Sequence, residues 1–211
     1  RRLELRRLQP LSRPPIVIGS RGSQLALWQA RWVKKTFLRH HPDLEIAIAV
    51  IKTTGDKIHD VPLAKVGRKG LFIKEIESAL LSGDIDLAVH SLKDMPAELP
   101  QQLCIGAITE REDPRDVLIA HSDLSLAQLP AKARIGTSSL RRQAQLLHER
   151  PDLTITPLRG NLDTRLKKLH SEDLDAIVLA AAGVHRMEMQ DRISAYLSPD
   201  LMLPAVGQGA L

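Results

Sequence analysis

Short apolar runs alternate with segments of helical periodicity along this chain, and this alternation limits the possible fold more than any other feature. The runs at 16–18 and 45–51 predict strands, and the periodic segment between them predicts a helix capped by Ser23. A second helix, which ends near Gly83, leads to a further apolar run at 87–89. The order β-α-β-α-β is typical of a parallel sheet with right-handed crossovers, so we expect an α/β fold.

The second half of the chain repeats this order after a charged segment at 110–116. An apolar run just before that segment predicts one more strand, and further strands and helices follow it. The strands are predicted at 103–108, 117–120, 133–136, 153–157 and 176–180, and the helices at 139–149 and 162–169. We therefore expect two domains, with 16–108 and the glycine-punctuated segment 203–211 in domain 1 and 109–202 in domain 2.

The net charge of +5 is concentrated at the N-terminus. Residues 1–15 contain five arginines and one glutamate, which is 5 − 1 = +4 and leaves about +1 for the other 196 residues. We expect this segment to be a disordered basic extension or the remnant of an organelle transit peptide. The nearly neutral remainder predicts no nucleic-acid partner. No apolar run approaches the roughly 20 residues of a membrane span, so no membrane partner is expected.

Cys104 is the single cysteine, so the chain cannot form an internal disulfide. This favours a reducing compartment, and we expect a cytoplasmic location, or a plastid if the extension is a transit remnant. The apolar neighbours of Cys104 predict a small core residue. No Cys/His spacing is typical of zinc, and no metal is expected.

A polar cluster follows the apolar run at 87–89, where open α/β sheets place their ligands. It contains His90, Ser91, Lys93 and Asp94. One interpretation is a solvated loop. In the other, Lys93 holds an anion while Asp94 handles a positive charge or a proton.

Two further junctions between a strand and a helix carry arginines. Arg141 and Arg142 lie in the first turn of the predicted helix 139–149, where the helix dipole makes a cation unfavourable. Two arginines there suggest a bound anion that offsets them. The segment from Arg159 to Arg165 has the same chemistry at the start of the next helix, and Arg21 lies beside a helix start near the N-terminus.

The segment 57–70 is basic and has no periodicity. It contains Lys65, Arg68 and Lys69 among glycines, which is typical of a mobile lid or of a surface excursion.

Seven segments together resemble the porphobilinogen deaminase family, also called hydroxymethylbilane synthase. They run in order over about 16–211 and read GSRGSQLALWQA (19–30), LAKVGRKGLFIKEIE (63–77), AVHSLKDMP (88–96), EREDPRD (110–116), GTSSLRRQAQL (136–146), LRGNLDTRL (158–166) and LPAVGQGAL (203–211). The resemblance implies two domains of the type II periplasmic-binding-protein kind with the active cleft between them, and a third, C-terminal domain. We also expect a monomer.

The resemblance also implies a transferase of tetrapyrrole biosynthesis, the route to haem and chlorophyll. In this family four porphobilinogen molecules lose ammonia and are joined head to tail on a covalently held dipyrromethane primer, which gives hydroxymethylbilane. Each pyrrole carries an acetate and a propionate, so the growing oligopyrrole chain gains two carboxylates per ring. Arginine-rich turns suit such a chain, because a guanidinium binds a carboxylate through two hydrogen bonds.

Residue by residue, Asp94 resembles the family's catalytic carboxylate. Loss of ammonia leaves a cationic azafulvene, which a buried carboxylate beside the pyrrole N–H stabilises. The residues that resemble the family's binders of cofactor and substrate are Arg21, Ser91, Lys93, Thr137, Ser138, Ser139, Arg141, Arg142, Arg159, Arg165 and Arg186. The basic loop corresponds to the family's lid, with Lys65 and Lys69 in it.

One part of the family pattern is missing from this sequence. The family's primer is attached to a cysteine of a third, C-terminal domain, and Cys104 does not occupy that position. We therefore expect a truncated or separately encoded two-domain portion that is inactive alone or nearly so. The alternative is an anion-binding two-lobe solute receptor or effector-binding domain, which would need no acid-base carboxylate.

Overall fold

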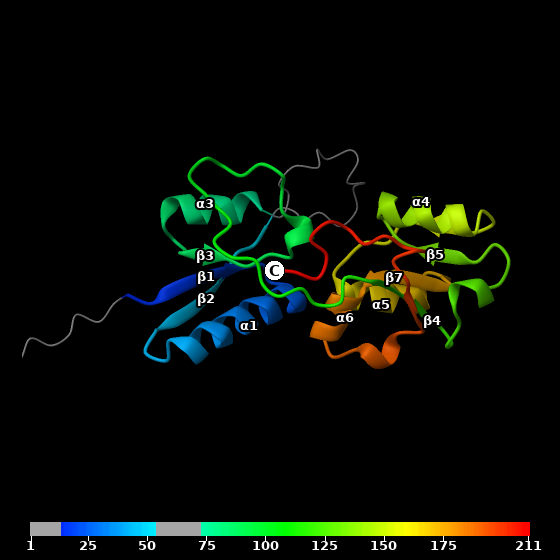
Figure 1. Cartoon of the computed structure of the whole chain (residues 1–211), viewed down its shortest axis with the longest axis horizontal. Coiled ribbons are helices and arrows are strands. Elements are labelled where there is room, and N and C mark those ends of the chain that lie inside the picture. The colour runs from blue at the N-terminus through cyan, green and yellow to red at the C-terminus, as the bar shows by residue number, and fades with distance from the viewer. Residues whose placement is uncertain (1–13, 54–72) are drawn as a thin grey trace, which may run out of the picture.

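The computed structural model describes residues 14–53 and 73–211 (Figure 1). Most of the predicted N-terminal extension and the whole predicted lid, with Lys65 and Lys69, lie outside the described residues. In the part of the chain that is described, no helix is long and apolar enough to cross a membrane.

The first half of the chain forms a parallel sheet of three strands in the order β2-β1-β3. These strands are β1 (Ile16–Ser20), β2 (Ile46–Val50) and β3 (Leu87–Ala88), with β1 paired in parallel to both others. Helix α1 (Gln24–His40) lies on one side of the sheet and α3 (Lys74–Ser82) on the other (Figure 1). A small aliphatic core around the buried Ile18 holds these layers together.

The helix boundaries follow the predicted local signals. Ser23 caps α1, because its hydroxyl accepts a hydrogen bond from the backbone N–H of Ala26 at 3.3 Å. Helix α3 ends at Gly83, which has a φ of 79° and therefore adopts the left-handed conformation that glycine tolerates best.

The second half forms a mixed five-stranded sheet in the order β6-β5-β7-β4-β8. The strands are β4 (Asp116–Ala120), β5 (Arg134–Gly136), β6 (Thr154–Thr156), β7 (Ala176–Ala180) and β8 (Ala195–Leu197). Strands β5, β6 and β7 are parallel, whereas β4 runs antiparallel to both β7 and β8. The helices are α4 (Leu140–Glu149), α5 (Leu162–Ser171) and α6 (Ala181–Arg186). Two short 3-10 turns lie in the connections, η2 (Leu126–Gln128) between β4 and β5 and η3 (Gln190–Arg192) between α6 and β8.

The central strands β4 and β7 of this second sheet are buried on both faces. Successive residues of β4 point to opposite sides, so that Leu118 joins one apolar cluster while Val117 and Ile119 join the other. The residues of β7 divide in the same way, with Val178 on one face and Ile177 on the other. Burial of both faces explains why these strands read as continuous apolar runs rather than as alternating patterns.

The predicted strand at 103–108 is wrong. The structure assigns no strand there, and Ile105 and Ile108 are 47% and 58% exposed. The segment connects the first sheet to the second, and an apolar run becomes a strand only where a neighbouring strand is available to pair with it. Cys104 is exposed for the same reason, so its assignment to the core is also wrong.

Two other differences lie in the second sheet. The short strand β8 was not predicted, since three residues are too few to give a clear period. The antiparallel entry of β4 was not predicted either, because strand direction depends on pairing and leaves no trace in the local pattern.

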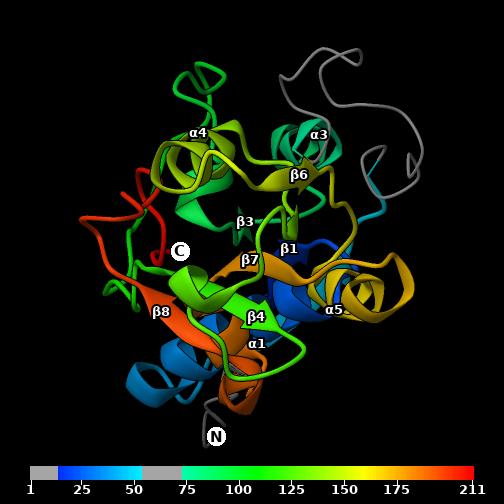
Figure 2. The same ribbon diagram turned by 90° about the vertical axis from the view of Figure 1, so that its right-hand side faces the viewer.

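The segment 203–211 returns to the first half of the molecule, and the C-terminus lies between the two sheets (Figures 1 and 2). Residues 206–209 form a turn, and no strand is assigned to 203–211. The carbonyl oxygen of Ala210 accepts from the N–H of Leu92 at 3.0 Å, and that of Gly209 accepts from the N–H of Glu112 at 3.2 Å. The exact domain boundaries stay a prediction.

Gly209 gives a test of this chain return. Its φ is 100°, and a Cβ atom there would overlap the carbonyl oxygen of Glu112. We expect Gly209→Ala to lower the free energy of unfolding by about 2 kcal/mol or more, measured by urea denaturation. As a control, Gly106→Ala places its Cβ in open space and should change stability by less than about 0.5 kcal/mol. Equal stabilities of the two variants would contradict the tight packing of residue 209.

Candidate functional site

The polar segment after β3 is held in a 3-10 turn, η1 (Leu92–Asp94). The side chain of Gln29, which is 3% exposed on α1, donates a hydrogen bond to the Ser91 hydroxyl at 2.9 Å. The turn closes through the N–H of Met95, which donates to the carbonyl oxygen of Leu92 at 3.1 Å. The predicted site segment therefore has a defined conformation, and Gln29, which no sequence pattern singled out, helps to hold it.

Lys93 is surrounded by charges from both halves of the molecule. Its pKa falls from 10.5 to about 8, first because the ammonium group is buried and then because of nearby charges. In decreasing order, those charges belong to Arg142, Asp94, Asp116 and Arg165. The two arginines lower the pKa of Lys93 and the two carboxylates raise it. Lys93 therefore lies among other cations whose repulsion the carboxylates offset only in part.

Arg141 and Arg142 both pair with the fully buried carboxylate of Asp116 at the start of β4. The Nη2 atoms of Arg141 and Arg142 lie 2.6 and 2.7 Å from the two oxygens of Asp116. Arg142 is 6% exposed and also donates from Nη1 to the carbonyl oxygen of Val178 at 2.8 Å. Burial raises the pKa of Asp116, but the two guanidinium groups outweigh it and hold that pKa below its usual value.

An anion thus offsets the two arginines in the first turn of α4, as the sequence suggested, but this anion belongs to the chain itself. Sequence reasoning missed Asp116 because the charged segment 110–116 was interpreted only as a domain junction and a family motif. One guanidinium donor remains without a partner among the described atoms, since the buried Nε of Arg142 makes no hydrogen bond.

Arg165 and Asp94 belong to the same neighbourhood. Burial lowers the pKa of Arg165, the charge of Arg142 lowers it further, and the charge of Asp94 opposes the shift. Arg165 also donates from Nε to the carbonyl oxygen of Gly160 at 2.8 Å. Asp94 itself is exposed, so the expectation of a buried carboxylate is wrong for this structure.

The charges of Arg21 and Asp94 both act on His90, the residue before Ser91. Burial lowers the pKa of His90, Asp94 raises it and Arg21 lowers it, so both charges lie within range of His90. Arg159 is half-buried in the turn before α5.

The three predicted hydroxyl groups shape the turn before α4. Ser139 caps the helix by accepting from the N–H of Arg142 at 3.5 Å, and Thr137 Oγ1 accepts from the N–H of Ser139 at 3.2 Å. Ser138 is exposed, and its hydroxyl donates to the carbonyl oxygen of Leu158 at 2.9 Å. These contacts aim the first turn of α4, with its arginines, at Asp116.

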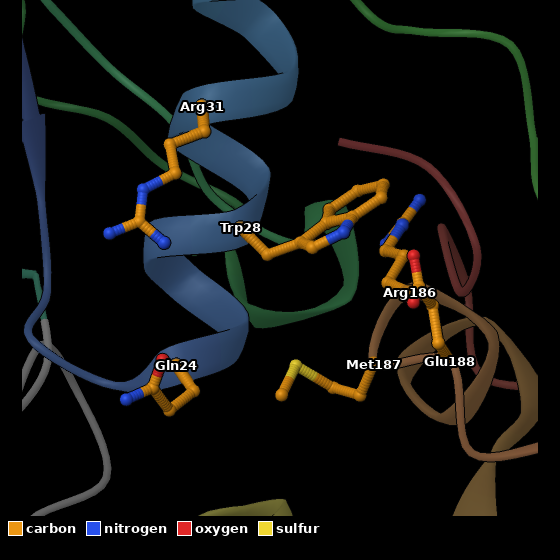
Figure 3. A pocket seen from close by; sticks show the side chains of 6 residues that line it. All are labelled: Gln24, Trp28, Arg31, Arg186, Met187 and Glu188. Atoms are coloured by element: carbon orange, nitrogen blue, oxygen red, sulfur yellow. The ribbon is translucent and has the colours of Figure 1, made fainter.

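Arg186 has a different set of partners. Its Nη2 donates to the carbonyl oxygen of Gly209 at 2.6 Å, and its guanidinium lies 6.0 Å from the centre of the Trp28 ring. Figure 3 shows the two side chains facing each other across the contact of α1 and α6. They line a cavity of about 230 Å³ with Gln24, Arg31, Met187 and Glu188. Arg186 is therefore placed at this contact and not among the partners of Lys93.

We use the term cation cluster for Lys93, Arg141, Arg142 and Arg165. These four cations face only the carboxylates of Asp94 and Asp116 in the contacts described above, so positive charge is in excess. Guanidinium groups in a site of low polarity bind carboxylates strongly, and the excess charge suits a ligand with several carboxylates. Among the described residues, no group of three or more potential ligand side chains is arranged for a metal ion.

Two lobes of α/β structure that bring charged residues together are typical of the periplasmic-binding-protein class. The structure resembles the periplasmic substrate-binding protein of an ABC transporter from Coxiella burnetii, with a TM-score of 0.51 and 14% sequence identity over 88% of this chain and 80% of that one. This likeness concerns the fold alone, and it agrees with the predicted fold class.

The sequence comparisons identify the family. The family model described as "Porphobilinogen deaminase, dipyromethane cofactor binding domain" matches residues 16–211, and the chain belongs to the porphobilinogen deaminase family. It is 60% identical to the porphobilinogen deaminase of Syntrophotalea carbinolica over 95% of this chain and 64% of that protein. It is 60% identical to that of Syntrophomonas wolfei over 92% of this chain and 63% of that protein. The chain therefore spans less than two thirds of the length of these relatives.

We expect Asp116→Asn to destabilise the protein strongly. The change removes the charge that two guanidinium groups share in a buried site, and breaking such an arrangement costs about 3–5 kcal/mol. Urea denaturation measures the loss. The matched control is Asp173→Asn, because Asp173 pairs with Arg134 while its side chain is 94% exposed, and its loss should cost about 0–1 kcal/mol. Similar losses in both variants would contradict the central role of Asp116.

Lys93 should titrate near pH 8, measured by NMR of 13C-labelled lysine side chains. Because its pKa is lower in the folded than in the unfolded chain, the folded state disfavours the charged form below pH 8. The penalty is relieved as the pH rises from about 8 toward 10.5, so this group's contribution to stability increases through that window. The increase should be absent from Lys93→Arg, which stays charged, and present in the exposed control Lys35→Arg. A Lys93 midpoint above pH 10 would contradict the crowded basic environment.

Proposed function

We propose that this chain is the substrate- and cofactor-binding part of a porphobilinogen deaminase (hydroxymethylbilane synthase). Such an enzyme joins four porphobilinogen molecules head to tail, with loss of ammonia, into hydroxymethylbilane. The observation that carries the proposal is the meeting of Lys93 from the first half with Arg142 and Arg165 from the second half, close to Asp94. The family membership and the 60% identity to proteins of that name support it.

The chemistry of the cation cluster suits a pyrrole chain. Each pyrrole brings two carboxylates, and the cluster has more cations than its own carboxylates neutralise. In this proposal Lys93, Arg142 and Arg165 bind carboxylates directly, while Arg141, Arg21, Arg159 and the turn 137–139 complete the cleft.

The same residues fit the dipyrromethane cofactor. Two linked pyrroles carry four carboxylates, and the cation cluster supplies charge of the opposite sign from both halves of the chain. When bound, this group supplies the primer to which the first substrate is joined. The chain's own residues bind and orient its carboxylates, and Asp94 is the residue left to act on the reacting ring.

Asp94 is proposed as the catalytic carboxylate. It is exposed at the end of η1, where a ligand held by Lys93 and Arg165 brings a pyrrole ring within reach. There it accepts a hydrogen bond from the pyrrole N–H and stabilises the positive charge that forms on the substrate as ammonia leaves. A bound ligand also excludes water from Asp94, which strengthens this electrostatic stabilisation.

The organisation proposed for the chain follows the two sheets. Domain 1 consists of 16–108 and 203–211, and domain 2 of 109–202. The hydrogen bond between Leu92 and Ala210 supports the assignment of the C-terminal segment to domain 1. The chain is proposed to be a monomer in the cytoplasm. The cytoplasm is a reducing compartment, where the exposed Cys104 would stay a free thiol.

The second candidate function is an anion-binding module without catalysis, because the same fold and the same cations serve that purpose. The two candidates differ in what they require of Asp94. A receptor needs no carboxylate in its anion site, whereas the deaminase depends on it.

Asp94→Asn separates them. The assay uses the chain extended by the part of the Syntrophotalea carbinolica relative that it does not span, so that turnover is measurable. We expect porphobilinogen consumption to fall by about 10²- to 10⁴-fold, because the amide carries no charge to oppose the cation. Binding of porphobilinogen should stay within about threefold by calorimetry, since Asp94 is not a carboxylate-binding group.

The matched control is Glu98→Gln, an exposed carboxylate four residues along the chain. It should leave both turnover and binding unchanged. Binding without any turnover in the unsubstituted extended chain, or turnover unaffected by Asp94→Asn, would favour the anion-binding module.

A further inference from the structure

Gln208 occupies an unusual position between two glycines. Gly207 and Gly209 have φ values of 70° and 100°, and a Cβ atom on Gly207 would lie 2.8 Å from Cγ of Leu92. A Cβ atom on Gly209 would overlap the carbonyl oxygen of Glu112. The two glycines thus let the backbone pass tightly between η1 and the segment that leads into β4. Gln208 is carried into this gap and is 1% exposed.

The amide group of Gln208 can be oriented in only one way. Its Nε2 lies 2.6 Å from the carbonyl oxygen of Pro114 and 2.9 Å from Oδ1 of Asp116. Both partners are acceptors, so the NH₂ group must face them and a flipped amide would set oxygen against oxygen. The Oε1 atom therefore points to the opposite side, where Lys93 Nζ donates to it at 3.2 Å.

This arrangement makes a continuous chain of hydrogen bonds across the site. It runs from Lys93 on η1 through the Gln208 amide to Asp116, and from Asp116 to Arg141 and Arg142 on α4. Arg142 shares Oδ1 of Asp116 with Gln208, so the positions of the two side chains depend on each other. One neutral amide thereby links the cation of the first half to the cations of the second.

We propose that Gln208 is a positioning residue, which aligns Lys93 with the pair of Arg142 and Asp116 so that cations from both halves face one carboxylate ligand together. The identity of that ligand rests on the proposed function. Gln208 does not itself bind the ligand, since its oxygen and nitrogen are both engaged inside the protein. Its effect on binding passes through Lys93.

A substitution at Gln208 alters the pKa of Lys93 against the background of the charged groups already around Lys93. They are Asp94 on η1, Asp116 on β4, Arg142 on α4 and Arg165 on α5. Removing the Gln208 oxygen takes away an acceptor that favours charged Lys93, whereas a carboxylate at position 208 adds a negative charge beside it. A positioning role through Lys93 therefore predicts opposite shifts for the two substitutions, while mere loss of packing predicts the same direction for both.

The test is the NMR titration of Lys93 in the whole chain without ligand. Gln208→Met, which keeps the side-chain length, should lower the Lys93 midpoint by about half a pH unit or more. Gln208→Glu should raise it. The control is Gln145→Met, because Gln145 accepts from the Leu203 N–H at 2.7 Å but is not among the partners of Lys93. It should leave the midpoint unchanged.

Porphobilinogen binding gives the second measurement. Gln208→Met should weaken its binding by about three- to tenfold at pH 7.5, and the effect should vanish when Lys93→Met is already present. Unchanged Lys93 midpoints in both Gln208 variants overturn the inference, as does an equal effect of Gln208→Met with and without Lys93. Opposite midpoint shifts in a chain that binds no porphobilinogen support the positioning role and overturn the proposed function instead.

Discussion

The buried carboxylate of Asp116 is the interaction on which the rest of the site depends. Two guanidinium groups, a neutral amide and the start of β4 meet at its two oxygens, and its side chain has no exposure to water. Without that charge, Arg141 and Arg142 would face the positive end of the α4 dipole with nothing to offset them. The carboxylate allows the chain to keep two arginines in the first turn of a helix.

The mixed sheet explains how Asp116 reaches this place. Strand β4 runs antiparallel to β7, and Asp116 lies opposite Ala180 at the carboxyl end of β7. Helix α4 also begins beyond a carboxyl end, that of β5, which is parallel to β7. The first residue of β4 therefore lies at the edge where the helix starts gather, whereas a parallel β4 would have brought its last residue there.

The charged forms of two members of the cation cluster, Lys93 and Arg165, are destabilised in the folded chain. Burial together with neighbouring cations lowers the pKa values of Lys93 and Arg165, which means that the ligand-free site disfavours its own charges. The proposed ligand with several carboxylates would relieve this unfavourable state, and the removal of repulsion would then contribute to its binding free energy. Sites of this kind are less stable than the protein around them, and the two apolar clusters of the second sheet supply the stability that supports this one.

The sequence by itself determined the elements whose signals are local. These include the cap of α1 at Ser23, the end of α3 at Gly83 and most of the apolar strands, although the run at 103–108 forms no strand. The family motifs were also recognisable in the sequence, and the family model matches residues 16–211. Only the tertiary structure decided which side chains meet. It exposed Cys104, gave Arg186 a separate set of partners beside Trp28 and joined Gln208 to an Asp116 that is 92 residues away. Periodicity and capping act over a few residues, whereas these contacts depend on strand direction and chain return, which no short pattern encodes.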